Sequence, residues 1–448
     1  MSTITDYSFS FRLVKNYIVT TFRRYYGEYI VLGKENIPSG CPVIYAPNHI
    51  NAFMDAIAIH SIAPYELPVI FLARADIFKS KSARKLLQFS KILPAFRMRD
   101  GIENLGKNNE VFEQCVDILH QNKALGIMPE GNQGEQRKLR PLVKGIFRIA
   151  FAAQQKYDVQ PGVKIVPVGL DYGDLAKFGK HIIINVGKPI EISDYMKIHA
   201  ENPVTAMNDI REKLGSELND LSLNLATEEY YDCFEIITGM ADGAFLKKLD
   251  LEDTTVSRFK ARQEIAKKLV SIEKNEKPKI EKLNSLSKDF NLTMKKLNLR
   301  NWVWEQNSQN KTSFIPKGLK LVVTLPVFLY GLVCNFLPFF IPVYVRKHTI
   351  KVEYEGFFSS LQFVLGIITF PLFYSIQTIL VYNLAFVPWW AAVLFFFGQY
   401  PTGKYAINWY SEARKYNASI KFRKLTKNKS KDLLHVQQLR EQIQSLIS

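Results

Sequence analysis

Two residues near the start of the chain have the types and spacing to move a proton. His49 follows a short apolar run that ends at Tyr45, and Asp55 lies six positions after it. Histidine titrates near neutral pH, and a neighbouring carboxylate fixes its tautomer and stabilises the imidazolium. The pair fits a general base with its carboxylate partner. The same pair of residues would also be found if His49 had only a structural role at the end of a strand.

Helix geometry limits how His49 and Asp55 can meet. Residues six apart point to different sides of one continuous helix, because each residue turns the chain by about 100°. His49 must therefore precede the helix that holds Asp55. We expect a helix over residues 52–62 with Asn51 as its N-cap, which places Asp55 in the first turns, where the helix dipole favours a carboxylate.

The segment around this pair, residues 28–190, alternates between strand and helix patterns and predicts an α/β domain. The functional signals Asn-His, Pro-Glu-Gly and Pro-Val-Gly fall at strand ends, where loops carry function in open α/β sheets. The expected strands are 43–45, 69–72, 124–128, 165–168 and 182–186. The expected helices are about 52–62, 80–90, 103–121 and 142–156.

Further stretches could bind a substrate. The segment ILPAFRMR contains Arg97 and Arg99, the segment IMPEGNQG contains Glu130 in a Pro-Glu-Gly turn, and residues 137–148 are rich in Lys and Arg. An arginine fork is the natural partner of a phosphate. Each stretch alone is weak evidence, because basic loop residues are usually only solvated and a Pro-Glu-Gly turn is more often structural than catalytic.

In this order and spacing, the blocks resemble the glycerolipid acyltransferase family that includes 1-acylglycerol-3-phosphate acyltransferases. The resemblance covers about residues 30–190, less than half of the chain. Its first block is Asn48-His49 with Asp55, its second Arg97, its third Pro129-Glu130-Gly131 and its fourth Val166-Pro167-Val168.

The resemblance implies acyl transfer from a thioester, acyl-CoA or an acyl carrier protein, to the hydroxyl of 1-acylglycerol-3-phosphate. His49 would take the hydroxyl proton and Asp55 would orient the imidazole. The product would be phosphatidate, made in phospholipid biosynthesis without a metal or cofactor. The oxyanion would be stabilised by backbone amides near Gly131 or the helix start. The implied substrate-binding residues are Arg97, Arg99, Glu130, Gly131, Asn132 and Lys144.

Two departures from the family pattern bear on the acceptor. Five residues separate His49 from Asp55, where the family usually has four, and the turn before the helix could absorb the extra one. Asn132-Gln133 stand where the family commonly has Thr-Arg. The missing arginine leaves phosphate binding to Arg97 or Arg99, or to substitutes among Arg137, Lys138 and Lys144. Glycerol-3-phosphate or an amino-acid-containing lipid therefore stays open as the acceptor.

Composition points towards a membrane surface. The chain has 448 residues, a formal net charge of +17 and 13% aromatic residues. Such a basic excess suits anionic lipid or nucleic acid, and no Walker loop, zinc spacing or nucleic-acid motif favours the second. The four cysteines show no paired spacing, so neither a disulfide framework nor a zinc site is expected. Residues 8–26 predict a basic, aromatic amphipathic helix that lies in a membrane interface or packs on the next domain.

The C-terminal part contains two uncharged runs, 321–345 and 356–403. A membrane-spanning helix needs about 20 apolar residues, so the second run has room for two helices, split near residues 382–383. Three prolines in the first run predict a re-entrant segment or a tight hairpin. The basic residues between and after the runs predict, by the positive-inside rule, that both flanks and the catalytic domain are cytoplasmic.

The sequence thus predicts an integral membrane protein in five parts. These are an amphipathic helix (1–27), an acyltransferase domain (28–200), a helical region (201–318), membrane-embedded hairpins (319–403) and a basic cytoplasmic tail (404–448). The expected partners are a lysophospholipid acceptor, an acyl thioester donor, the lipid bilayer and, as donor, an acyl carrier protein, with no nucleic acid. A non-catalytic lipid-binding or scaffold protein is the alternative of another class.

Overall fold

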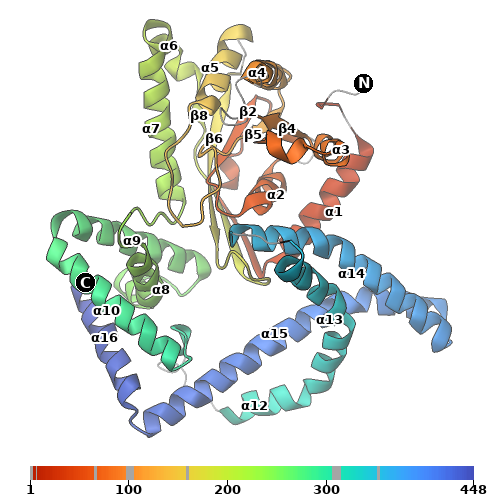
Figure 1. The fold of residues 1–448 in the computed structure, drawn as a ribbon, viewed down its shortest axis with the longest axis vertical. Helices are drawn as coiled ribbons and strands as arrows, with labels where there is room; N and C mark the ends of the chain where they lie inside the picture. The colour runs from red at the N-terminus through yellow and green to blue at the C-terminus, as the bar shows by residue number, and fades with distance from the viewer. Residues whose placement is uncertain are drawn as a thin grey trace. The chain divides into compact units, whose positions relative to one another are not determined.

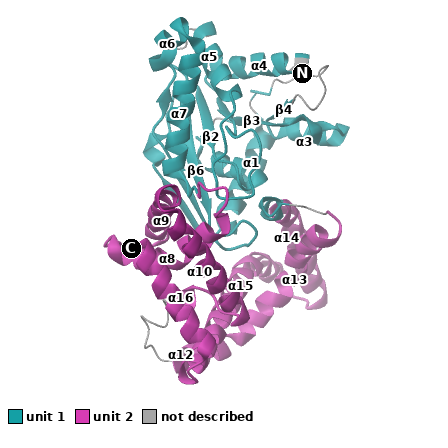
Figure 2. Ribbon diagram, turned by 60° about the vertical axis from the view of Figure 1, so that its left-hand side comes forward, with its two compact units in different colours: residues 1–224, 353–360 teal, residues 225–352, 361–448 magenta. Residues whose placement is uncertain are grey.

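The structure is a computed structural model that describes residues 4–6, 8–64, 68–96, 105–157, 161–304, 314–350 and 354–448. It divides into two compact units, shown in Figure 2. The first contains residues 1–224 and 353–360, and the second contains residues 225–352 and 361–448. We describe each unit by itself.

The first unit is built on a mixed eight-stranded sheet with strand order β1-β7-β6-β2-β5-β3-β4, and β8 pairs with β6 (Figure 1). The pairs β2-β5, β2-β6, β3-β5, β3-β4 and β1-β7 are parallel, whereas β6 pairs antiparallel with β7 and β8. The strands are β1 (Glu28–Leu32), β2 (Val43–Pro47), β3 (Val69–Arg74), β4 (Ile92–Ala95), β5 (Ala124–Gly126), β6 (Lys164–Tyr172), β7 (His181–Val186) and β8 (Ile190–Glu191).

Helices cover both faces of this sheet. One face carries a core cluster in which Ile44 and Ile165 of the strands pack with Phe147 of α5 and Leu214 of α7. On the other face α2 contacts β2 and β3, and α1 packs on α2. The helices are α1 (Phe9–Tyr25), α2 (Ala52–Ile62), α3 (Lys81–Phe89), α4 (Leu105–His120), α5 (Gly145–Tyr157), α6 (Met196–Glu201) and α7 (Pro203–Leu221).

These elements confirm the predicted α/β class and the positions of the five expected strands and four expected helices. The prediction that the third strand reaches residue 128 was wrong, because the last hydrogen bond to β2 is from Ile127 N–H to Tyr45 O and the chain then turns, so that Gly131 N–H bonds Met128 O. Three strands, β1, β4 and β8, were not predicted. β4 has only four residues, contains Pro94 and lies at the sheet edge, where proline is tolerated.

The second unit is helical among its described residues. Helices α8, α9 and α10 pack on one another and on α16, around buried side chains that include Phe234, Leu269 and Leu283. The helices are α8 (Tyr231–Lys248), α9 (Thr255–Asn275), α10 (Lys277–Lys296), α12 (Phe314–Val323), α13 (Leu325–His348), α14 (Gly356–Leu384, of which the first turn belongs to the first unit), α15 (Trp389–Lys427) and α16 (Lys431–Ile447).

Two of these helices, α13 and α14, are long and apolar enough to cross a membrane, with mean hydropathy of 1.8 and 1.9. Only 28% and 11% of their most apolar windows is buried, unlike the core helix of a soluble protein. This exposure of apolar side chains indicates membrane association. The chain between α14 and α15 falls close to the predicted split near residues 382–383.

The first uncharged run is broken at the first of its three prolines only, since α12 ends at Val323 and α13 begins at Leu325 with Pro326 in its first turn. The predicted break at the other two prolines, into a re-entrant segment or tight hairpin, was wrong. α13 continues through Pro338 and Pro342 as one helix. A helical proline lacks the N–H that would bond the carbonyl four residues earlier. Gln377 Nε2 instead donates to Cys334 O at 3.0 Å, and Thr369 Oγ1 donates to Pro338 O at 2.9 Å. Side chains of α14 therefore satisfy both orphaned carbonyls, as an apolar environment requires.

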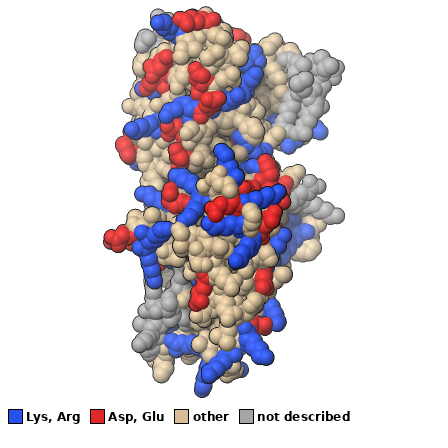
Figure 3. Space-filling model, turned by 90° about the vertical axis from the view of Figure 1, so that its left-hand side faces the viewer, with Lys and Arg blue, Asp and Glu red and all other residues tan. Residues whose placement is uncertain are grey.

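The charged side chains on the face shown in Figure 3 are mixed in sign. Lysines and arginines lie among aspartates and glutamates there, so the net positive charge does not form a single basic patch on this face.

Candidate active site

The turn after β2 is fixed to the neighbouring strand by Asn48. Its Nδ2 donates to Leu170 O at 3.2 Å, and its Oδ1 accepts from Leu170 N at 2.6 Å. The side chain thus pairs with β6 as a backbone residue would, just where β2 stops. Asn48 is 6% exposed. The next residue, His49, is therefore presented at the carboxyl end of a central parallel strand, where α/β sheets place their sites.

His49 and Asp55 form a hydrogen-bonded pair. The distance from His49 Nδ1 to Asp55 Oδ2 is 2.8 Å, and the His49 side chain is 18% exposed whereas that of Asp55 is fully buried. Because a carboxylate only accepts, the shared hydrogen is assigned to Nδ1. Nε2 is then left with its lone pair, as a base that removes a proton requires.

The carboxylate of Asp55 is held by four donors. Besides His49, Oδ2 accepts from the backbone N–H of Ile50 at 3.0 Å and of Asn51 at 2.8 Å. Oδ1 accepts from Tyr172 Oη at 2.6 Å. Burial raises the pKa of Tyr172 well above its ordinary value, so its hydroxyl keeps its hydrogen and donates. The carboxylate therefore holds the imidazole in one orientation.

Glu130 fixes the backbone of His49 from the opposite side. Its Oε1 accepts from His49 N–H at 2.7 Å, while Oε2 accepts from Arg140 N and Nε, each at 3.1 Å. The carbonyl of His49 in turn accepts from Gly134 N–H at 2.9 Å. Burial raises the pKa of Glu130, and the hydrogen bonds from His49 and Arg140 oppose that rise. The Pro-Glu-Gly loop is thus a brace for the turn that carries the histidine.

The arrangement is a buried carboxylate, an oriented imidazole with one nitrogen available, and a rigid backbone at the end of a sheet. It is suited to taking a proton from a hydroxyl that attacks a carbonyl carbon. The described residues contain no group of three or more His, Cys, Asp or Glu side chains that could hold a metal ion.

Comparison with known proteins agrees with this geometry. Residues 28–171 match the family model described as Acyltransferase, and this range holds His49, Asp55 and Glu130. The chain carries a domain of the acyltransferase family. The prediction drawn from the sequence blocks is thereby confirmed at the level of the family.

Three curated relatives share sequence with the chain. The glycerol-3-phosphate O-acyltransferases 1 and 2 of Saccharomyces cerevisiae are 24% and 23% identical over 62% of this chain, and the matches span only 38% and 39% of those proteins. The 1-acyl-sn-glycerol-3-phosphate acyltransferase of Borreliella burgdorferi is 28% identical over 43% of this chain and 68% of its own length.

One of the solved structures that pair with the chain is an acyltransferase. It is the 1-acyl-sn-glycerophosphate (LPA) acyltransferase PlsC from Thermotoga maritima, with 16% identity and a TM-score of 0.34 over 46% of this chain and 79% of that chain.

The acyltransferase domain absorbs the extra residue between His49 and Asp55 in the turn before α2. Ala52, the first residue of α2, has a φ of 43°, in the left-handed region that side chains rarely adopt. Asn51 is the N-cap residue, as predicted, but its side chain makes no cap hydrogen bond. The expected capping hydrogen bond is therefore absent, since the Asn51 side chain accepts from Ser359 Oγ and the Met54 N–H that it could have capped donates to Asn51 O and to Ser360 Oγ.

Of the remaining predicted site residues, the structure describes Gly131, Asn132 and Lys144. Arg97 and Arg99 lie outside the described residues. Gly131 adopts a φ of 69°, and its N–H is used within the turn. The oxyanion was expected to be stabilised by backbone amides near Gly131 or at the start of the helix. The backbone amides at the start of α2 remain the candidates. Asn132 and Lys144 are exposed on the surface of this unit.

Three cationic side chains of the acyltransferase domain lie near the catalytic turn. Arg137 and Lys138 line a pocket with Asn48 and Glu130, and Arg137 is ion-paired with Asp171. Arg140 pairs with Glu130, and its Nη2 is buried with no hydrogen-bond partner among the described residues. Positive charge is therefore available beside Glu130 although Gln133 stands where the family commonly has arginine.

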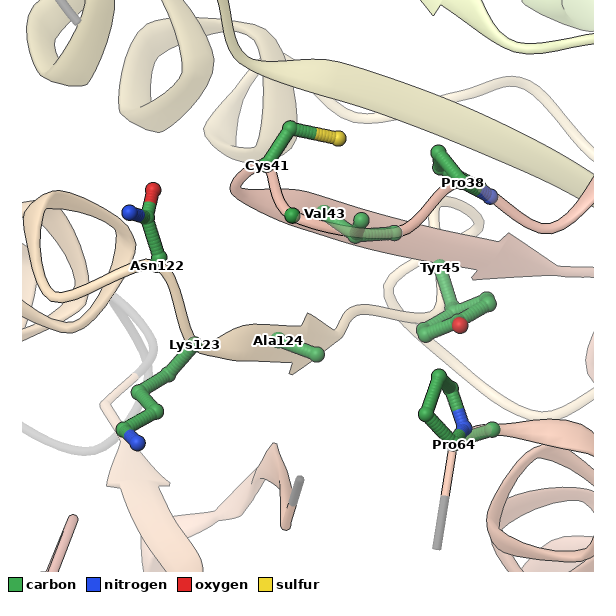
Figure 4. Close-up of a pocket in the computed structure, with 10 residues that line it drawn as sticks. Pro38, Cys41, Val43, Tyr45, Pro64, Asn122, Lys123 and Ala124 are labelled. Carbon is green, nitrogen blue, oxygen red and sulfur yellow. The ribbon is translucent and has the colours of Figure 1, made fainter. Parts of the chain in front are cut away.

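A second pocket lies at the amino ends of two central strands of the sheet (Figure 4). Val43, at the start of β2, and Ala124, at the start of β5, line it with Pro38, Cys41 and Tyr45. It is at the amino ends of these parallel strands, whereas His49 is at the carboxyl end of β2. The pocket in Figure 4 is therefore separate from the candidate site at His49.

Sequence reasoning missed Tyr172 and two serines, Ser359 and Ser360, that contact the turn. Tyr172 directly follows the stretch IVPVGLD, so a strand prediction that extended four residues beyond residue 168 would have included it. The serines begin the second uncharged run, and no local pattern marks them. Their contacts with Asn51 and Met54 join positions about 300 residues apart.

Proposed function

We propose that the protein transfers an acyl group from a thioester donor to a hydroxyl of glycerol-3-phosphate. The observation that carries the proposal is the buried His49–Asp55 pair, whose Nε2 is available and whose backbone is fixed by Glu130. As the acceptor oxygen attacks the acyl carbon, His49 takes its proton. Asp55 stabilises the imidazolium that forms, and the proton then passes to the departing thiolate.

The choice of acceptor is supported by the curated relatives. Two of them are named glycerol-3-phosphate O-acyltransferases, and they match over 62% of this chain, well beyond the acyltransferase domain. The Asn132-Gln133 departure is in keeping with an acceptor other than lysophosphatidate. We propose that the phosphate binds beside Glu130, where Arg140 Nη2 and Lys138 can donate to it.

A second acceptor, 1-acylglycerol-3-phosphate, which would give phosphatidate, is favoured by the match to the Borreliella burgdorferi enzyme. The donor in both reactions is acyl-CoA or an acyl carrier protein. We further propose that the catalytic domain faces the cytoplasm, because basic residues flank the uncharged runs. Protease protection of the domain in sealed vesicles of known orientation tests that assignment.

The test is acyl transfer by purified protein in lipid vesicles, with labelled acyl-CoA and each acceptor offered separately. We expect lysophosphatidate to form from glycerol-3-phosphate, and His49→Ala to lower kcat by about 10²- to 10⁴-fold. Phosphatidate formed only from 1-acylglycerol-3-phosphate would keep the chemistry and overturn the acceptor. No product with either acceptor, from acyl-CoA or from an acyl carrier protein, would overturn the proposed reaction.

The proposed phosphate site is tested by a separate variant. Arg140→Gln should raise KM for glycerol-3-phosphate by about tenfold while KM for acyl-CoA stays unchanged, because a hydrogen bond to a charged group is worth about 1.5–3 kcal/mol. Arg148→Gln is the matched control. Arg148 is an exposed arginine of the same basic segment, and it lies over the ring of Phe112.

A further inference from the structure

A segment from far along the chain lies against the catalytic turn. Residues 353–360, which include the first turn of α14, belong to the same compact unit as the sheet. Two serines of this turn, Ser359 and Ser360, are only 2% and 5% exposed, and Asn51 beside them is 1% exposed. Burial at this level means that each hydroxyl needs a partner.

The partners are all in the His49–Asp55 turn. Ser359 Oγ donates to Asn51 Oδ1 at 2.7 Å. Ser360 Oγ donates to Asn51 O at 3.3 Å and accepts from Met54 N–H at 3.3 Å. Gly356 completes the fit, because a Cβ at that position would collide with Ile50 O and with the Gln133 amide.

These contacts hold Asn51, the residue immediately before the strained residue Ala52. Asn51 supplies one of the two backbone N–H groups that bind Asp55 Oδ2, and the next residue, Ala52, has a φ of 43°. A non-glycine residue in the left-handed region costs of order 1–3 kcal/mol and persists only when its surroundings over-determine it. Ser359 and Ser360 fix Asn51 at both its side chain and its carbonyl, immediately before the strained residue.

We propose that Ser359 and Ser360 are positioning residues for the general base. They hold Asn51, Asn51 holds Asp55, and Asp55 orients His49. The inference rests on the proposed function, since it assigns to these serines a part in the same proton transfer. It also ties the site to a helix that continues as an apolar segment of membrane-crossing length. The opening residues of a candidate membrane helix are, on this inference, part of the acyltransfer site.

If Ser359 and Ser360 served only in packing, their variants would have different effects on stability and on kcat. Loss of a buried hydroxyl lowers stability wherever it occurs, without a selective effect on kcat. A positioning role lowers kcat while leaving KM for both substrates nearly unchanged, because only the alignment of the base is disturbed. It also makes the effect of Ser359 depend on Asn51, since the serine acts through that side chain alone.

The experiment uses the full chain in lipid vesicles, with Ser359→Ala, Ser360→Ala, Asn51→Ala and the pair Ser359→Ala with Asn51→Ala. Ser375→Ala is the matched control, because Ser375 is an exposed serine of the same helix. We expect each serine variant to lower kcat by about tenfold with KM within about twofold. The double variant should be no slower than Asn51→Ala alone, and Ser375→Ala should keep the parent kcat.

A second readout does not depend on the substrate. Diethyl pyrocarbonate modifies accessible neutral imidazoles, and mass spectrometry of the His49 peptide gives its rate of modification. With the turn released, His49 should react faster by about three- to tenfold in the serine variants than in Ser375→Ala, because the loss of one hydrogen bond is worth about 1 kcal/mol. If the parent chain acylates no acceptor, the proposed function fails, and this rate still tests the positioning role.

Two results would overturn the proposal. One is an unchanged kcat and an unchanged His49 modification rate in both serine variants. The other is a double variant that is slower than Asn51→Ala by the full factor of Ser359→Ala, since the serine would then act independently of Asn51. A variant that loses its folded state is recognised by its melting curve, and Ser359→Cys, of nearly the same size, then replaces it in both readouts.

Discussion

The two ends of α2 each bear a histidine, and their surroundings differ. Before the helix, His49 shares a hydrogen with Asp55 and keeps 18% of its side chain exposed. In the last turn, His60 has its Nδ1 buried with no hydrogen-bond partner among the described residues, and its ring packs against Phe71 and Phe11 at centroid distances of 5.1 and 6.5 Å.

The difference teaches what converts a histidine into a base. Desolvation, and then the charge of Lys15, lowers the pKa of His60 to about 3, so this ring stays neutral and serves as an aromatic packing group. His49 instead has a carboxylate to stabilise its protonated form and an outer nitrogen within reach of a substrate. Residue type is the same at both ends of one eleven-residue helix, and the neighbours decide the chemistry.

The largest expected effect comes from removing the charge that distinguishes the two ends. Asp55→Asn keeps an oxygen that can accept from Ile50 N–H and Asn51 N–H, but it no longer stabilises an imidazolium at His49. We expect kcat for acyl transfer to fall by about 10²- to 10⁴-fold. His60→Phe, the matched change at the other end, should leave kcat unchanged. A comparable loss of activity in both variants would show that the helix as a whole, and not its first end, carries the effect.

A smaller effect should follow from Tyr172, which contacts only the His49 end. Tyr172→Phe removes the 2.6 Å hydrogen bond to Asp55 Oδ1 and keeps the buried ring. The three donors at Oδ2 remain, so we expect kcat to fall by only about five- to tenfold, the value of one hydrogen bond. Steady-state kinetics in vesicles measures it. An unchanged kcat would mean that Asp55 is sufficiently held by the turn alone.

Much of the His49 end could be predicted from the sequence, because its signals are local. The apolar run, the Asn-His pair and the helical spacing that follows place His49 before α2 and Asp55 in its first turns. The same locality explains why the positions of strands β2, β3, β5, β6 and β7 were predicted. Each is a short apolar run bounded by turn residues, and burial on both faces of a largely parallel sheet selects such runs.

The rest depends on partners that are distant in sequence. Tyr172 reaches Asp55 only because β6 extends beside β2 and pairs antiparallel with β7, which no local pattern announces. Ser360 meets Met54 across 306 positions. The sequence of α13 alone predicts breaks at Pro338 and Pro342, because the side chains that satisfy the orphaned carbonyls come from another helix. In all three examples the deciding contact is a hydrogen bond between residues far apart in the sequence. In α13 such bonds override the tendency of proline to end a helix.

The smallest effect concerns stability at the His60 end. An unfolded chain protonates this histidine near pH 6.5, whereas the folded chain does so only near pH 3. The unfolded state therefore binds the extra proton between these values, and stability falls as the pH is lowered through this range, by up to about 1.4 kcal/mol per pH unit.

His60→Phe should remove this share of the acid sensitivity while keeping the ring between Phe11 and Phe71. Between pH 6 and pH 4 we expect the free energy of unfolding of the parent chain to drop by about 2 kcal/mol more than that of the variant, or roughly 4–8 °C in melting temperature. Melting curves at the two pH values in the same detergent give the comparison. Equal losses in both proteins would mean that His60 is already protonated in the folded state. Its contrast with His49 would then lie in geometry alone.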